Sequence, residues 1–410
     1  MTLQLHNIAN LFTIIFGKLP GQLVIQITNY CNASCPQCGM RKTARIERRK
    51  LKGERIRNIL DQCRENGIDA VSLTGGEPFF NFQEAVDLLR YAGRRGITYL
   101  RSGTNGYMFA YGGQAAMTEK TEEFVKALAA TGIRNFWISL DSADTQTHET
   151  MRGLPGVVGG IKNALPVFHA HGIFPAVNLG INRNISGQPI PPVRGPEDED
   201  RFFESMRAGF TAFFSKALSL GFTMANVCYP MSSAREELSE DKAVYGAVSS
   251  AGIISFSPEE LRLVFKALLE VIPEFRDRIR IFTPLSVLYA LSQKDKRSLF
   301  PCLGGCRYFY LDSNGRIYPC GYRGDEELGE DLGGASRQAR TAKPFCVKCH
   351  WECFRDPSQL FGLARYLIRH PVRTLITKRV DPVMLRLWGQ DIRYYIKCDF
   401  FDGRKPMETK

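Results

Sequence analysis

The chain has 410 residues and carries 54 Lys and Arg against 42 Asp and Glu, so its formal net charge is +12. This length allows one large domain with an appendage, or two to three units, and excludes a small scaffold that depends on disulfides. Hydrophobic residues make up 44% and charged residues 23%, which excludes wholesale disorder. The positive excess favours anionic partners. No recognition motif for nucleic acid accompanies it, so we do not expect the chain to bind nucleic acid.

No apolar run approaches the roughly 18 residues that a transmembrane helix needs. The nearest, residues 8–16, contains Asn10 and Thr13, and no basic residue other than His6 precedes it, so a signal peptide is not expected. The chain is therefore predicted to be cytoplasmic. In a reducing compartment the twelve cysteines are not expected to form disulfides, and their clustering favours metal ligation.

The chain alternates short β-rich runs with longer helical patterns from residue 21 to 232. The predicted strands are residues 23–28, 70–73, 99–102, 135–140, 174–181 and 221–229, and predicted helices include 53–66, 83–95, 120–130 and 157–171. Six βα units in series imply parallel strands with helices outside. The predicted fold is α/β, a partial (βα)6 TIM-like barrel.

Four further segments flank the predicted barrel. Residues 1–20 form a predicted amphipathic helix, 233–300 a helical connector, 301–357 a Cys- and Gly-rich module and 358–410 a basic helical tail. Within the tail, residues 359–371 carry Leu360, Leu363, Ala364, Leu367 and Ile368 on one helical face, with Arg365 and Arg369 beside it. That pattern is typical of an interfacial helix, but the favoured interpretation is that the helix packs against the barrel with its arginines in solvent.

The first cysteine cluster follows the first predicted strand. Cys31, Cys35 and Cys38 have C-x3-C-x2-C spacing, which lets one loop place three thiolates around a single inorganic centre. A structural zinc site and an ordinary iron–sulfur cluster are both closed by four protein ligands. Three thiolates leave one position open for a substrate or cofactor, unless a distant residue completes a zinc site.

Together with Gly75-Gly76-Glu77-Pro78 after the second strand, this loop resembles the radical S-adenosylmethionine (SAM) superfamily. The resemblance implies a [4Fe–4S] cluster on the three cysteines that binds SAM through its open iron. It also implies reductive cleavage of SAM to a 5′-deoxyadenosyl radical that abstracts a substrate hydrogen atom. A reductant such as flavodoxin or ferredoxin is the implied partner.

The same resemblance implies roles for residues that follow the strands. It assigns Gly75, Gly76 and Glu77 to the methionine amino group, and Arg183 to the SAM carboxylate, with a solvated loop arginine as the alternative. Thr104, Asn105, Ser139 and Asp141 are expected near the methionyl and ribose portions, and residues 227–229 near the adenine. His148 and Arg152 are expected to position a loop. Gln37 departs from the aromatic residue that many members place before the third cysteine.

The second cysteine cluster resembles the SPASM or twitch extension of radical SAM enzymes. Cys302 and Cys320 flank a predicted hairpin that turns at residues 312–315, and Cys346, Cys349 and Cys353 follow. The resemblance implies one auxiliary [4Fe–4S] cluster, or two, with Cys302, Cys320, Cys346 and Cys349 as the favoured ligands. Cys306 and Cys353 are alternatives or part of a second site, and a zinc ribbon is the alternative to a cluster. Cys63, Cys228 and Cys398 are interpreted as ordinary thiols.

The predicted function is therefore that of a radical SAM enzyme, an oxidoreductase or a catalyst of C–C or C–S bond formation. The substrate is expected to be amphiphilic, as a lipid is, or a biosynthetic metabolite, and an amphiphilic substrate would fit peripheral contact with the inner membrane surface. One alternative is a maturase of a ribosomal peptide or protein. Another, of a different class, is a non-catalytic iron–sulfur protein for electron transfer.

Overall fold

A computed structural model of the chain describes residues 21–42, 47–110, 114–232, 242–295, 298–341, 346–369 and 381–407. The predicted amphipathic helix at residues 1–20 lies outside them. So do the backbone of residues 370–380 and the side chains of Arg365, Leu367, Ile368 and Arg369. No helix in the described part of the chain combines the length and the apolar character needed to cross a membrane.

In the part of the chain that the structure describes, one curved, open sheet of nine strands organises the fold, in the order β7-β6-β5-β4-β3-β2-β1-β8-β9. The strands are β1 (Gly21–Thr28), β2 (Ile68–Gly75), β3 (Tyr99–Thr104), β4 (Ile133–Ser139), β5 (Ala176–Gly180), β6 (Met224–Cys228), β7 (Arg280–Ile281), β8 (Tyr308–Leu311) and β9 (Ile317–Tyr318). All neighbours pair in parallel except β8 and β9. The predicted partial barrel of parallel strands is confirmed.

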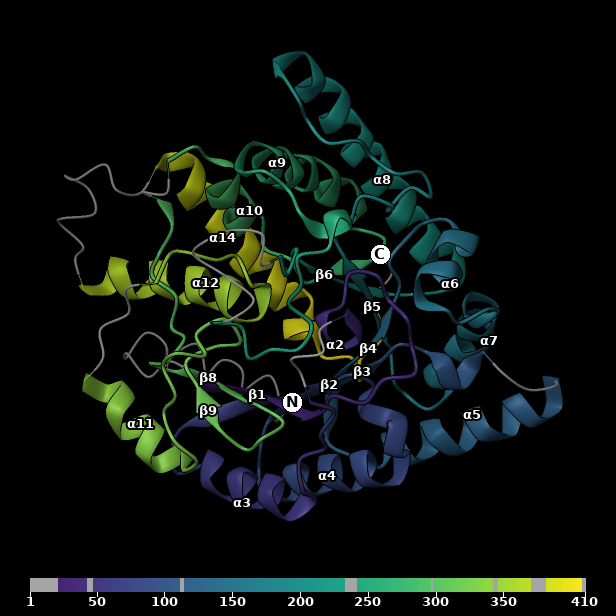
Figure 1. Cartoon of the computed structure of the whole chain (residues 1–410), viewed down its shortest axis with the longest axis vertical. Helices are drawn as coiled ribbons and strands as arrows, with labels where there is room; N and C mark the ends of the chain where they lie inside the picture. Colours follow the sequence, from purple (N-terminus) through teal and green to yellow (C-terminus); the bar gives the residue numbers. More distant parts are fainter. Residues whose placement is uncertain are drawn as a thin grey trace.

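Helices cover the outer face of the sheet (Figure 1). Those of the barrel are α3 (Gly53–Cys63), α4 (Phe82–Arg94), α5 (Gln114–Ala129), α6 (Thr145–Arg152), α7 (Val157–Ala170) and α8 (Glu199–Leu220). The short α2 (Gly39–Lys42) directly follows Cys38 and lies near the middle of the molecule in Figure 1. Short 3-10 helices lie at η1 (Pro78–Asn81), η2 (Tyr107–Phe109), η3 (Pro196–Asp198), η6 (Gly252–Ile254) and η8 (Asp399–Phe401). Because parallel strands are covered on both faces, β1 is buried at all its residues.

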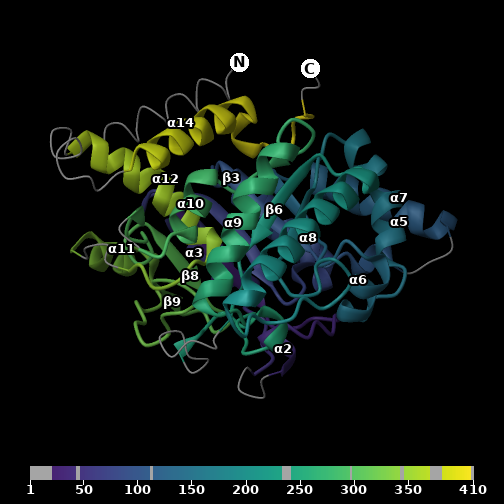
Figure 2. The ribbon, with the colours of Figure 1, turned by 90° about the horizontal axis from the view of Figure 1, so that it is seen from above.

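The second half of the chain adds α9 (Pro258–Phe275), α10 (Leu285–Ser292), α11 (Leu332–Thr341), α12 (Glu352–Arg369) and α14 (Pro382–Lys397). Helices α12 and α14 both pack against α10, on the same side of the molecule in Figure 2, and the Trp388 Nε1 of α14 donates to the Leu360 carbonyl of α12 at 3.0 Å. Helix α9 begins at a capping box, in which the Ser257 hydroxyl accepts from the Glu260 N–H. Of the predicted interfacial helix, Leu363 is fully buried beside Phe300 and Met384, so this part of α12 packs against the protein.

The hairpin predicted between Cys302 and Cys320 is present as β8 and β9, and it extends the barrel sheet. Strand β8 pairs in parallel with β1, from Gln22 opposite Tyr308 to Ile25 opposite Leu311. A second apolar core surrounds Trp351 beneath this hairpin and includes Tyr308, Tyr310 and Phe354. The cysteine-rich segment and the barrel therefore share one sheet and meet directly.

Candidate active site

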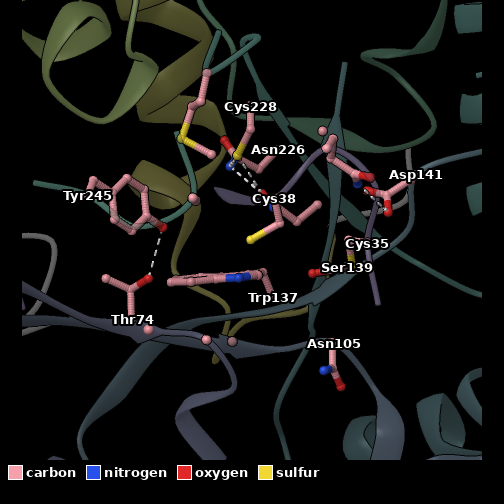
Figure 3. A pocket seen from close by; sticks show the side chains of 18 of the residues that line it. Cys35, Cys38, Thr74, Asn105, Trp137, Ser139, Asp141, Asn226, Cys228 and Tyr245 are labelled. Atoms are coloured by element: carbon pink, nitrogen blue, oxygen red, sulfur yellow. Dashed lines mark hydrogen bonds between the residues drawn. The ribbon is translucent and has the colours of Figure 1, made fainter. Parts of the chain in front are cut away.

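A cavity of about 230 Å³ lies inside the curved sheet, towards the carboxyl ends of the strands. Alternate residues of successive strands line it, because side chains two apart on a strand project to the same face. These are Val24, Ser72, Thr74, Arg101, Gly103, Trp137, Ser139, Asn178, Gly180, Asn226 and Cys228. In Figure 3 the Trp137 ring extends across the cavity between Thr74 and Ser139, and Cys38 points towards it.

The predicted cysteine loop forms one wall of this cavity. Cys31, Cys35 and Cys38 all line it together with Gly75, Gly76 and Glu77. The Cys31 Sγ accepts from the Ala33 N–H at 3.4 Å and from the Asn105 Nδ2 at 3.7 Å. A Cβ at position 76 would stand 2.2 Å from the Tyr30 carbonyl oxygen. Glycine at this position therefore lets the two loops meet.

The donor set of this loop fits a metal cluster with an open position. Burial raises the pKa of the Cys35 thiol to about 11 and that of Cys38 to about 12. The negative charge of the other cysteines of the loop raises both pKa values further. Binding of a metal would therefore release protons from these thiols. No three His, Cys, Asp or Glu side chains among the described residues could enclose a single metal ion. A cluster of several irons and sulfides holds its thiolates farther apart than one ion does, which suits this loop better.

Glu77 is fully buried and ties the second strand end to the third. Its Oε2 accepts from the Asn105 N–H at 2.7 Å, and its Oε1 accepts from the Phe79 N–H at 3.1 Å. Burial raises the pKa of Glu77 to about 7, against the opposing effect of these hydrogen bonds. The carboxylate is thus held in place while still lining the cavity, where a bound cation would favour its charged form.

Asp141 and Arg152 form a buried ion pair in the cavity wall. The Arg152 Nε and Nη2 donate to the Asp141 carboxylate at 2.8 and 3.0 Å, and Gln37 Nε2 donates to it at 3.2 Å. The Asp141 N–H donates to the His148 Nδ1 at 3.0 Å. Burial alone would raise the pKa of Asp141, but the charge of Arg152 holds it below its usual value. Gln37, the residue directly before the third cysteine of the loop, takes part in this network.

Thr104, Asn105 and Ser139 also line the cavity, whereas Arg183 is not among its lining residues. The Arg183 guanidinium donates to Glu260 at 2.7 Å and to the Ser255 carbonyl at 2.9 Å, and it lies over the Phe256 ring. It is neither in the cavity nor solvated. Two other arginines, Arg101 and Arg152, line the cavity instead.

The later cysteines separate into two places. The Cys302 N–H donates to the Cys346 carbonyl at 2.8 Å, and Cys302, Cys320 and Cys349 interact electrostatically. The four favoured auxiliary ligands are thus brought together. Cys353, in contrast, lines the cavity, and so does its neighbour Glu352, to which its thiol donates a hydrogen bond at 3.4 Å. The structure does not bring Cys306 into the cavity lining.

Sequence reasoning missed several residues of this site. Glu352 is buried, accepts from the Tyr229 N–H at 3.3 Å and lines the cavity. The sequence places the backbone of residues 227–229 near the adenine and gives the Cys228 thiol no role, whereas in the structure this thiol lines the cavity, with its Sγ 3.3 Å from Asn178 Oδ1. Cys63, in contrast, is buried in α3, where its thiol donates to the Ile59 carbonyl. The position of Cys228 at the end of a barrel strand was the available signal; no local pattern marked Glu352.

Comparison with known proteins gives the family context. AdoMet-dependent heme synthase of Methanosarcina barkeri is 21% identical over 323 residues, which is 75% of this chain and 79% of that protein. GTP 3′,8-cyclase of Peptoclostridium acidaminophilum is 31% identical over 160 residues, or 37% of this chain and 45% of that protein. The structure of native anSMEcpe with bound AdoMet and Cp18Cys peptide has a TM-score of 0.53 at 14% identity, covering 91% of this chain and all of that one.

The fold of anSMEcpe thus extends over both the barrel and the cysteine-rich half of this chain. The sequence model of the radical SAM superfamily matches residues 25–182, the stretch that contains Cys31, Cys35, Cys38 and Gly75 to Glu77. That superfamily uses a [4Fe–4S] cluster and SAM. Residues 25–182 therefore belong to the radical SAM superfamily.

Proposed function

We propose that this chain is an enzyme that cleaves SAM reductively and uses the resulting radical to abstract a hydrogen atom from a substrate in the cavity. The observation that supports this proposal most is the convergence of Cys31, Cys35 and Cys38 with Gly75 to Glu77 on one cavity wall. A pure electron carrier needs no such cavity beside its cluster loop. When bound and given one electron by an external reductant, the cluster and SAM would supply methionine and a 5′-deoxyadenosyl radical.

The residues of the chain have distinct tasks in this proposal. Cys31, Cys35 and Cys38 hold the cluster and leave one position for SAM. The Glu77 carboxylate, positioned by two backbone N–H groups, accepts a hydrogen bond from the methionine ammonium. Thr104, Asn105 and Ser139 contact the remaining SAM groups from the strand ends. The Asp141–Arg152 pair keeps the wall rigid and polar without supplying a free carboxylate to the ribose.

An auxiliary cluster on Cys302, Cys320, Cys346 and Cys349 completes the proposal. These four sulfur ligands lie in or against the apolar core around Trp351, and Trp351 also lines the cavity. An electron left on a product radical would therefore have a short path to the auxiliary cluster. Cys353 packs against the same core but also lines the cavity, which none of these four does, so it is the candidate for direct contact with the substrate.

A peptide is a second substrate class, and its support is one likeness in fold. The anSMEcpe structure holds a peptide, and the likeness covers 91% of this chain. The buried positions of Leu360 and Leu363 in α12 give no corresponding support to a lipid substrate.

Anaerobic assay of the reconstituted chain with SAM and dithionite tests the proposal. The intact chain should release 5′-deoxyadenosine and hold about 8 Fe, four for each [4Fe–4S] centre. A Cys31→Ala, Cys35→Ala, Cys38→Ala triple variant should keep about half the iron and release none. The matched control is Cys63→Ala, which removes a buried thiol outside the cavity and should retain both. Release of 5′-deoxyadenosine by the triple variant, or none by the intact chain, would contradict the proposal.

A further inference from the structure

The cavity contains a positively charged side chain without a partner. Arg101 is the third residue of β3, on the same face as Gly103, and it lines the cavity. Its Nε is buried and unpartnered, and no residue in the described part of the chain gives its guanidinium a hydrogen bond or an ion pair. Two aromatic rings flank it, with the guanidinium carbon 5.8 Å from the Trp137 centroid and 5.5 Å from that of Phe282.

Arg101 is half-buried, and two other arginines that are largely enclosed by protein, Arg276 and Arg280, differ from it in this respect. Arg276 pairs with Asp391 at 3.0 Å, and Arg280 donates to the backbone carbonyls of Asp402 and Lys405. A guanidinium has five N–H donors and no acceptor, and it keeps its charge at all relevant pH values. Removing such a charge from water without a counter-charge costs free energy, which cation–π contacts offset only in part.

The groups near Arg101 do not supply a counter-charge. Tyr99 interacts with it electrostatically, but burial raises the pKa of Tyr99 to about 12, so its hydroxyl is neutral. Cys353 is a second electrostatic neighbour. Of the carboxylates that line the cavity, Asp141 is already paired with Arg152 at 2.8 Å and Glu77 accepts from two backbone N–H groups. The third, Glu352, accepts from the Tyr229 N–H and from the Cys353 thiol, and among the ion pairs of the described residues none joins it to Arg101. The planar fork of a guanidinium matches a carboxylate or a phosphate group.

We infer that Arg101 is an oxyanion subsite of this cavity and that the substrate carries a carboxylate or phosphate group which binds there. The subsite lies deep in the barrel. Arg101 precedes Thr104, at the end of β3, by three residues, which places it about 10 Å below the rim where the cysteine loop lies. Gly103 makes room for the Trp137 ring, because a Cβ at this position would stand 2.3 Å from that ring. Glycine therefore allows Trp137 to lie over β3 next to Arg101.

This inference rests on the proposed function only in that it assigns the cavity to the substrate, and the two can fail separately. Assay of 5′-deoxyadenosine tests SAM cleavage, whereas equilibrium binding tests the subsite. The probes are benzoate and its neutral counterpart benzamide, which share a ring suited to Trp137 and Phe282 and differ in charge. Titration calorimetry is done anaerobically on the reconstituted chain with saturating SAM and again without it.

Benzoate should bind the intact chain at least about tenfold more tightly than benzamide, as charge-assisted hydrogen bonds predict. Arg101→Gln should abolish that preference, Arg101→Lys should keep part of it, and the control Arg278→Gln should leave it unchanged. Arg278 lies over the Phe275 ring on the surface, outside the cavity lining. Equal affinities for the two probes in the intact chain, or an unchanged preference in Arg101→Gln, would overturn the inference.

Two further measurements identify the source of the oxyanion and exclude a structural role. If SAM and benzoate bind together, the subsite serves a second substrate; if SAM competes and Arg101→Gln weakens SAM binding, the oxyanion is the carboxylate of SAM. Thermal unfolding of Arg101→Met should be unchanged or shifted to higher temperature, since no ion pair is lost. A marked fall in the unfolding temperature of Arg101→Met, together with equal binding of the two probes to the intact chain, would show that Arg101 has a structural role instead. A preference for benzoate that is lost equally in Cys353→Ser would assign the subsite to that thiol.

Discussion

At the scale of single residues, the site depends on groups whose protonation is controlled by burial. His148 is fully buried, and its Nδ1 accepts from the Asp141 N–H at 3.0 Å, so the ring is neutral there. Burial lowers the pKa of His148 to about 4, and the charge of Arg152 acts in the same direction. The unfolded chain, with a histidine pKa of about 6.5, binds this proton more readily.

We therefore predict a loss of stability in acid that His148 causes. Because its folded pKa is below the unfolded value, its contribution is fully present above about pH 6.5 and is lost as the pH falls towards about 4, a change of about 3 kcal/mol. Urea unfolding across this range measures it. His148→Gln keeps an acceptor for the Asp141 N–H without titrating, so its free energy of unfolding should vary less. The same pH dependence in both proteins would contradict the assignment.

At the scale of elements, close contact between two loops builds the cysteine wall. In Gly76→Ala the added Cβ would meet the Tyr30 carbonyl oxygen at 2.2 Å and the carbonyl carbon at 2.6 Å, both backbone atoms that cannot turn aside. The cysteine loop should shift, and iron per chain should fall by about half, with loss of SAM cleavage. The control is Gly159→Ala in α7, where a Cβ meets nothing within 4 Å and stability should rise by about 0.5–1 kcal/mol. Full iron content in Gly76→Ala would show that the loop tolerates the shift.

A second prediction concerns the loop after β5, which contains Arg183. Arg183 connects the segment after β5 to the start of α9 through Glu260, whose carboxylate also accepts from the Val193 and Ser257 N–H groups. Arg183→Met should lower the free energy of unfolding by about 3–5 kcal/mol, because it leaves a buried carboxylate unpaired. Adding Glu260→Gln should restore part of that stability, and the double variant should bind SAM as the intact chain does. A tenfold weaker affinity for SAM, about 1.4 kcal/mol, would instead favour the carboxylate contact that the family resemblance implies.

At the scale of the whole molecule, the continuity of the sheet makes the cysteine-rich segment part of the barrel's stability. Strand β1 is buried along its length and pairs with β2 on one side and β8 on the other. A chain truncated before residue 298 would leave the β8-facing edge of β1 unpaired and would expose its apolar side chains.

We predict that such a truncated chain aggregates, since an exposed apolar edge strand is a template for pairing between molecules. Co-expression of residues 298–410 as a separate chain should return part of it to the soluble fraction, as size-exclusion chromatography would measure. A truncated chain that remains monomeric and unfolds at the same temperature as the intact chain would show that β8 adds nothing to the barrel.

The sequence by itself determined the features that depend on local spacing. The alternation of apolar runs and helical patterns predicted the parallel sheet, and the spacing of Cys31, Cys35 and Cys38 with the following Gly75 to Glu77 predicted where chemistry would lie. The turn at residues 312–315 predicted the β8–β9 hairpin. Such patterns are legible because a strand, a turn and a ligand loop are each set by neighbours along the chain.

Only the tertiary structure decided which distant residues meet. It brought Glu352 and Cys353 from the second half of the chain to the cavity of the first, paired Arg183 with Glu260, and left Arg101 without a counter-charge. These outcomes depend on the pairing of β8 with β1 and on the packing of α12 and α9 around the barrel. A charged residue has the same appearance in the sequence whether its partner is water, a carboxylate or a substrate, because its partner is set by long-range packing rather than by its neighbours along the chain.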